Sequence, residues 1–107
     1  DSHPSKKVAL DYVQKYDKMY GAGMRNQFAA HAYDTLLVLQ KIVPMALQKG
    51  QPGTKEFRAA LRDAMENFGP MPVSQGVLNF TRTDHWGFTP ESPVVLKVVN
   101  GDWEVQK

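Results

Sequence analysis

The feature that most constrains this fold is a long apolar stretch, residues 26 to 50, which the sequence predicts to be one helix. Asn26 is a favourable N-cap residue and Gly50 a favourable stop, and most residues between them are aliphatic or aromatic. The polar residues of the stretch fall on one narrow stripe, formed by His31, Asp34, Lys41 and Gln48. A helix this apolar has to be covered on most of its sides.

Two more helices are predicted, one before this stretch and one after it. The first spans about residues 4 to 20, because proline suits the first helical turn and Gly21 suits the end. The last begins after Thr54 as its cap and ends at Gly69-Pro70. Each can cover one side of the central helix, which Pro44 should kink or tighten.

The residue pattern changes after Pro72, where short strands are predicted at 76–81, 92–99 and 102–106. Asn100-Gly101 is a strong hairpin signal between the last two strands. The fold class is therefore α+β, with three helices followed by a short strand and a β-hairpin. Because these strands are too few to cover the helices, we expect another part of a larger protein to supply a sheet.

Composition excludes several classes of function. The 107 residues allow one domain, and a net charge of +2 with dispersed lysines and arginines argues against a nucleic-acid partner. No run approaches the roughly 20 apolar residues of a membrane span. Cysteine is absent and the three histidines are isolated, so neither a metal site nor a cofactor is expected.

The segment Phe80 to Phe88, FTRTDHWGF, contains the only adjacent aspartate and histidine of the chain. Neighbouring residues of an extended segment point to opposite faces, so Asp84 and His85 cannot easily form the hydrogen bond of a catalytic triad. Nor does any serine lie in a nucleophile-elbow pattern. We therefore interpret Asp84 as a turn residue that caps its own backbone, and the protein as not an enzyme.

The start of the second helix is the other candidate site. Free N–H groups and the positive end of the dipole at a helix N-terminus favour a carboxylate, so Phe28 and His31 could lie beside a ligand. Packing of Phe28 in the core is the competing interpretation. Likewise Tyr12, Tyr16 and Tyr20 could stack on an aromatic ligand, or could pack inward with their hydroxyls in water.

Five segments of the sequence occur in a telling order: HPSKKVALDYVQKYDKMYG, FAAHAYDTLLVLQKIV, TKEFRAALRDAMEN, GVLNFTRTDHWG and VVLKVVNGDWEV. In order and spacing they resemble the C-terminal third of branched-chain amino-acid type substrate-binding proteins of ABC transporters, which have a type I periplasmic fold. The resemblance implies a two-lobed α/β receptor that captures a solute and delivers it to a membrane permease. It also implies that Phe80, Asp84, His85 and Gly87 form a connection and not a catalytic site.

By this resemblance, the chain is a single fragment, 1–107, that holds a helical part of the first lobe, 1–69, and a crossover with terminal strands, 70–107. The protein would lie in the periplasm or on the extracellular face. Its solute would be a branched-chain or aromatic amino acid, or a related small carboxylate. Phe28 matches an aromatic residue that walls the cleft in the family, and Asn26, Gln27 and His31 are its neighbours.

An alternative remains open from the sequence. The chain could be a free-standing α+β interaction module that hides its apolar central helix by self-association. The two hypotheses make different predictions. A receptor fragment should expose apolar surface, and should therefore bind hydrophobic dye, associate or exchange elements between copies, whereas a module should form an oligomer that buries its apolar patch.

Overall fold

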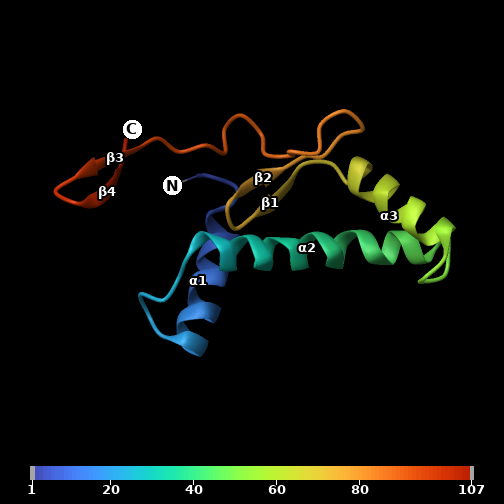
Figure 1. Ribbon diagram of the computed structural model, residues 1–107, viewed down its shortest axis with the longest axis horizontal. Helices are drawn as coiled ribbons and strands as arrows, with labels where there is room; N and C mark the ends of the chain where they lie inside the picture. Colours follow the sequence, from blue (N-terminus) through green and yellow to red (C-terminus); the bar gives the residue numbers. More distant parts are fainter. Residues whose placement is uncertain (1, 107) are drawn as a thin grey trace.

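The longest helix forms the axis of the molecule (Figure 1). The computed structural model describes residues 2 to 106, and in it helix α2 spans Gln27–Leu47. Asn26 caps the helix as predicted, because its side-chain oxygen accepts a hydrogen bond from the backbone N–H of Ala29 at 3.0 Å. The helix continues through Pro44, whose ring is exposed, so the proline is tolerated without a break in the helix.

Helix α3 (Lys55–Asn67) lies along the C-terminal half of α2 (Figure 1). Its predicted cap is confirmed: the Thr54 hydroxyl accepts a hydrogen bond from the N–H of Phe57 at 3.1 Å. The loop between the two helices is tight, because a Cβ atom at Gly50 would lie only 2.7 Å from the nitrogen of Phe57. Only glycine allows α3 to start this close to the end of α2.

Helix α1 (Lys6–Tyr20) crosses α2 only near the N-terminal end of α2 (Figure 1). It begins two residues later than predicted. Ser5 stands at its N-cap position, but the hydroxyl donates a hydrogen bond to the carbonyl of Gly76 and makes no cap bond to the helix. The rings of Tyr12 and Tyr33 meet at 5.3 Å where α1 and α2 cross. The expectation that α1 covers one side of α2 therefore holds only for the first part of α2.

A short hairpin, β1 (Met71–Val73) with β2 (Gly76–Leu78), packs on α2. Strand β1 was missed in the sequence because it is three residues long and contains proline. The strand predicted over 76–81 ends at Leu78, where the chain turns and pairs instead with the segment around Gly87. The core lies between this hairpin, α2 and α3, and its buried members are Val38, Ile42, Ala64, Val73 and Leu78.

The second hairpin joins β3 (Leu96–Val99) to β4 (Asp102–Val105) and extends away from the helices (Figure 1). Both turn residues have positive φ, 52° at Asn100 and 84° at Gly101, as the predicted hairpin requires. The strand predicted over 92–99 begins only at Leu96. Residues 92–95 include Pro93, which has no N–H to donate to a ladder.

Much of the apolar surface of α2 is left uncovered. Leu36, Leu39 and Leu47 are each between 44% and 50% exposed, although they belong to the apolar helix that must be covered. The observed architecture confirms the α+β class, and it also agrees with a fold that forms part of a larger protein.

Candidate functional site

The β1–β2 turn is held to α2 by one buried carboxylate. Asp34, which is 3% exposed, accepts hydrogen bonds from the backbone N–H of Ser74 at 2.7 Å and of Gln75 at 3.1 Å. Hydrogen bonds to an ionised acceptor are stronger than neutral ones, so this pair fixes the turn against the helix. The sequence marks Asp34 only as one member of a polar stripe. Its burial was the missing information, since the sequence does not show which stripe residue faces the hairpin.

A hollow of about 340 Å³ lies beside that turn, between α1 and the start of α2. Asn26 and Gln27 line it, together with Tyr12, Arg25 and Gln75. Its walls are polar on the α2 side, where the first turn of a helix presents N–H groups. Asn26 has already used its side-chain oxygen to cap Ala29, so its amide nitrogen is the group that remains for a solute.

The tyrosine that lines this hollow differs from the sequence-based expectation. Tyr12 is 7% exposed, and its hydroxyl has no hydrogen-bond partner among the described residues. Burial raises the pKa of Tyr12, since the charged phenolate would lose more hydration than the neutral phenol. The prediction that the tyrosine hydroxyls reach water is therefore wrong for Tyr12, whereas Tyr20 is 60% exposed.

A second hollow, of about 330 Å³, has mainly apolar walls and lies between α2 and the loop that contains Trp86. His31 lines it from α2. The His31 and Phe88 rings lie edge to face, with their centroids 6.2 Å apart. Trp86 contacts Phe88 in the same manner at 6.3 Å. An aromatic or aliphatic group suits these walls better than a charged one.

The four predicted site residues are thus divided among different surfaces. Asn26 and Gln27 line the first hollow, His31 lines the second, and Phe28 lines neither. Phe28 is 75% exposed, so packing in the core of this chain, the competing interpretation, is not observed. Sequence reasoning missed Trp86 and Phe88 as partners of His31, because no spacing rule connects them to α2.

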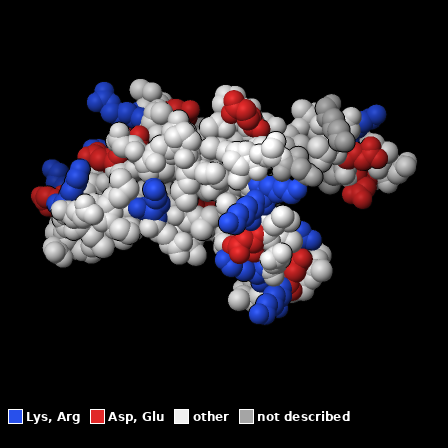
Figure 2. Space-filling view, turned by 180° about the vertical axis from the view of Figure 1, so that it is seen from behind, with Lys and Arg blue, Asp and Glu red and all other residues white. Residues whose placement is uncertain are grey.

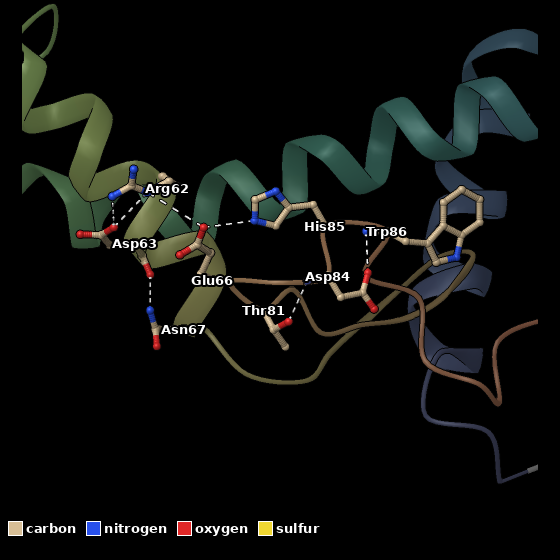
Figure 3. Close-up of polar contacts among 8 residues, drawn as sticks. All are labelled: Arg62, Asp63, Glu66, Asn67, Thr81, Asp84, His85 and Trp86. Carbon is tan, nitrogen blue, oxygen red and sulfur yellow. Dashed lines mark hydrogen bonds and ion pairs between the residues drawn. The ribbon is translucent and has the colours of Figure 1, made fainter.

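Asp84 and His85 form no catalytic pair (Figure 3). Asp84 accepts a hydrogen bond from the N–H of Trp86 at 2.9 Å, which makes it the predicted turn residue. His85 instead lies with its Nε2 atom 3.1 Å from a carboxylate oxygen of Glu66 on α3, which is nearly buried. The histidine therefore attaches this loop to α3.

Charged side chains of both signs are mixed over α1 (Figure 2). On that helix Asp11 accepts hydrogen bonds from Lys15 at 2.6 Å and from the hydroxyl of Tyr33 on α2 at 2.8 Å. These two bonds, the lysine's first, lower the pKa of Asp11, and the bond to Asp11 raises the pKa of Tyr33. Asp11, Lys15 and Tyr33 thus join α1 to α2. Because acidic and basic side chains alternate, this face has no concentrated basic stripe.

Residues 2 to 106 hold neither a metal-binding cluster nor a membrane-spanning helix. No group of three or more histidine, aspartate and glutamate side chains there could hold a metal ion. Within the same range no helix has both the length and the apolar character needed to cross a bilayer.

The fold is that of a known class of protein: over its whole length the chain matches one part of solved extracellular ligand-binding receptors. One such receptor from Rhodopseudomonas palustris is 44% identical and another, from strain HaA2, is 40% identical, each with a TM-score of 0.88. A third solved structure, from strain CGA009 of the same species, is 41% identical with the same TM-score. Each match covers 100% of this chain but only 30% of the other chain. No family model matches the chain, and no curated protein does.

These matches agree with the resemblance seen in the sequence as far as a ligand-binding receptor of which this chain forms one part. Identity of 40–44% over the whole of this chain indicates more than a shared fold. The chain spans about 30% of the length of the receptors it matches.

Proposed function

We propose that this chain is the C-terminal part of the solute-binding component of an ABC importer, working in the periplasm or on the extracellular face. The observation that carries the proposal is the match of the whole chain to extracellular ligand-binding receptors at 40–44% identity. In this role the protein binds a solute and delivers it to a membrane permease, without catalysing a reaction. Residues 1–69 would form a helical part of the first lobe, and residues 70–107 the crossover and terminal strands.

The proposed solute is a branched-chain or aromatic amino acid, or a related small carboxylate. The start of α2 supports this choice, because it combines the N–H groups of a helix N-terminus with the exposed ring of Phe28. A carboxylate would lie at the N–H groups beside Asn26 and Gln27, and an apolar side chain would lie on Phe28. His31 is one turn further along the same helix but lines the second hollow, so it would contact the solute only from that side.

The test uses the full-length protein that contains this chain. A panel of branched-chain and aromatic amino acids and aromatic carboxylates is screened by thermal shift, and hits are titrated by calorimetry. Loss of the ring in Phe28→Ala should weaken binding about 5- to 150-fold, the equivalent of about 1–3 kcal/mol of buried apolar contact. Tyr20→Ala is the matched control, because Tyr20 is also an exposed aromatic residue but lies at the far end of α1.

Two results would contradict the proposal. If no member of the panel binds the full-length protein, the solute class is wrong. If Phe28→Ala and Tyr20→Ala bind a confirmed solute equally well, the assignment of Phe28 to the cleft wall is wrong.

A second candidate function has one observation in its favour. The exposed leucines of α2, Leu36, Leu39 and Leu47, are a surface that a self-associating interaction module would bury. Light scattering of the purified chain after size exclusion distinguishes the two. A single, stable oligomer that melts cooperatively favours the module, whereas dye-binding material of mixed size favours the receptor part.

A further inference from the structure

Three tyrosine rings meet where α1 crosses α2, and two of their hydroxyls have protein partners. The centroid of the Tyr12 ring lies 5.6 Å from that of Tyr16 and 5.3 Å from that of Tyr33. Tyr16 donates a hydrogen bond to the carbonyl of Met24 at 3.3 Å, and Tyr33 donates one to Asp11 at 2.8 Å. The Tyr12 hydroxyl is buried and has no partner among residues 2 to 106.

A buried hydroxyl without a partner is costly, because it has lost its hydrogen bonds to water and gained none in return. Native proteins contain few such groups, and each one calls for an explanation such as a ligand or a bound water. A phenylalanine would fill the same space without this cost. The oxygen of Tyr12 therefore indicates a partner that is absent from this chain.

The hollow of about 340 Å³ that Tyr12 lines is also lined by the first residues of α2. Asn26 caps the N–H of Ala29, whereas the N–H groups of Gln27 and Phe28 have no acceptor among the described residues. These groups lie at the positive end of the helix dipole. The amide nitrogen of Asn26 is a further donor. A wall of donors suits an acceptor, above all a carboxylate.

The charged groups around this hollow leave room for an anion. None of the residues that line it is acidic. Arg25 brings a guanidinium to the wall, where its Nε atom lies 2.9 Å from a carboxylate oxygen of Asp17. The nearby carboxylate of Asp34 is already engaged by the N–H groups of Ser74 and Gln75. A carboxylate in the hollow would therefore meet donors and one paired guanidinium.

We propose that Tyr12 is a specificity-determining residue, whose hydroxyl donates a hydrogen bond to the carboxylate of the solute in the hollow at the start of α2. The neutral phenol is the donating form, and burial, which raises the pKa of Tyr12, keeps the phenol neutral. Because the hydroxyl is buried while its ring lines the hollow, only a group that enters the hollow fully reaches it. The inference rests on the proposed function, to which it adds one residue and the place of the carboxylate.

Tyr12→Phe tests this in the full-length protein, because it removes one oxygen and keeps the ring. Tyr20→Phe is the matched control, since it removes a hydroxyl from the same helix at a side chain that is 60% exposed. The probes are isobutyrate, a small branched carboxylate, and isobutyramide, its uncharged counterpart. Each is titrated to about 100 mM, well above a Kd of about 1 mM, at constant ionic strength. NMR follows the backbone amides of Gln27 and Phe28.

We expect isobutyrate to shift both amide signals in the unmodified protein and in Tyr20→Phe. It should bind Tyr12→Phe about 10- to 150-fold more weakly, because a hydrogen bond to a charged group is lost. Isobutyramide should bind the unmodified protein more weakly than isobutyrate does, since its oxygen is uncharged. Equal binding of isobutyrate by the two variants would overturn the proposal, because a water molecule would then be the partner of the hydroxyl.

Urea unfolding without any ligand separates a binding role from a structural one. Tyr12→Phe should unfold at the same urea concentration as the unmodified protein or at a higher one, because the hydroxyl that it removes is unsatisfied. A lower midpoint would overturn the proposal, since the hydroxyl would then have a structural partner elsewhere in the receptor.

Gln27→Pro keeps the inference testable if Tyr12→Phe does not fold. Proline is favourable at the first helical position and has no N–H, so it removes one donor and leaves α2 intact. Gln27→Ala is its control. The proline variant should bind isobutyrate more weakly than the alanine variant, and equal binding would overturn the inference.

Failure of this inference differs from failure of the proposed function. If isobutyrate shifts neither amide at its highest concentration, the assignment of Tyr12 and of this hollow is wrong, while a panel solute that binds at Phe28 upholds the receptor role. If isobutyrate binds as expected but no panel member does, the proposed solute class is wrong and the role of Tyr12 stands.

Discussion

Replacement of Asp34 by alanine should release the β1–β2 turn from α2. The carboxylate is 3% exposed and accepts two backbone hydrogen bonds, from Ser74 at 2.7 Å and from Gln75 at 3.1 Å. Alanine removes both acceptors and leaves two partly buried N–H groups without partners. Val73, which is fully buried, immediately precedes those groups, so the effect should reach the core.

The cost follows from the two bonds. A hydrogen bond to a charged group contributes about 1.5–3 kcal/mol, so two of them amount to about 3–6 kcal/mol. Removal of a buried charge also relieves its desolvation penalty, and water can reach the turn once it opens. We therefore expect a net loss of about 2–4 kcal/mol, and a smaller loss for Asp34→Asn, which keeps one acceptor oxygen.

Hydrogen exchange at the amides of Ser74 and Gln75 measures this loss locally. A loss of about 2–4 kcal/mol corresponds to exchange faster by about 30- to 1000-fold, since about 1.4 kcal/mol is a factor of ten. Asp63→Ala is the control. Its carboxylate is 52% exposed and pairs with Arg62 at 2.8 Å, and exposed pairs contribute about 0–1 kcal/mol.

The reasoning would be refuted by a particular pattern of results. If Asp34→Ala and Asp63→Ala accelerate exchange at the turn equally, the buried carboxylate does not hold it. If Asp34→Asn exchanges as slowly as the unmodified protein, the charge contributes nothing, and the estimate for charged hydrogen bonds does not apply here.

Three further predictions concern single side chains. Gly87→Ala should destabilise the fold in urea by about 1–3 kcal/mol more than Gly23→Ala, because both have positive φ but only the Cβ at Gly87 would meet Phe80, at 2.5 Å; equal losses would contradict this. Pro44→Ala should raise the free energy of unfolding by up to about 3 kcal/mol, and with it the melting temperature, because alanine restores a helical N–H at an exposed site. A lower melting temperature would show that the proline is required. The hydrogen bonds to Asp11, from Lys15 first, lower its pKa from the ordinary value of 3.8, so its contribution to stability is present above that pH and is lost as the pH falls through the lowered pKa. Asp11→Asn should therefore reduce the pH dependence of the melting temperature below pH 3.8, and an unchanged profile would disprove the assignment.

The local features of the fold could be predicted because each depends on a few neighbouring residues. The caps at Asn26 and Thr54 were placed correctly, since capping requires an oxygen-bearing side chain just before an apolar repeat. The turn at Asn100-Gly101 was placed correctly for a similar reason, since few residues other than Asn and Gly accept positive φ. The turn role of Asp84 was also predicted.

Strand boundaries could not be predicted, because they depend on what the backbone pairs with. The residues after Leu78 are as compatible with a strand as those before it, yet Asn79 donates its N–H to the carbonyl of Gly87 and the chain turns. Strand β1 could not be predicted, because its stability comes from β2 and α2 and not from its own three residues.

The candidate site shows the same division. The sequence places Phe28 and His31 within one turn of a helix, but only the tertiary structure shows that they belong to different surfaces, with Phe28 in solvent and His31 against Phe88. The rings of His31 and Phe88 are 57 positions apart in the sequence, so no local spacing pattern predicts that they are in contact.

The sequence by itself determined that the chain is α+β, that its central helix is too apolar to stand alone, and that it resembles part of a receptor. It could do so because helix periodicity, capping and composition are local properties. The tertiary structure decided which polar residue is buried, where the hollows lie and which buried hydroxyl is left without a partner among the described residues. These depend on contacts between distant segments, and only a folded chain brings those segments together.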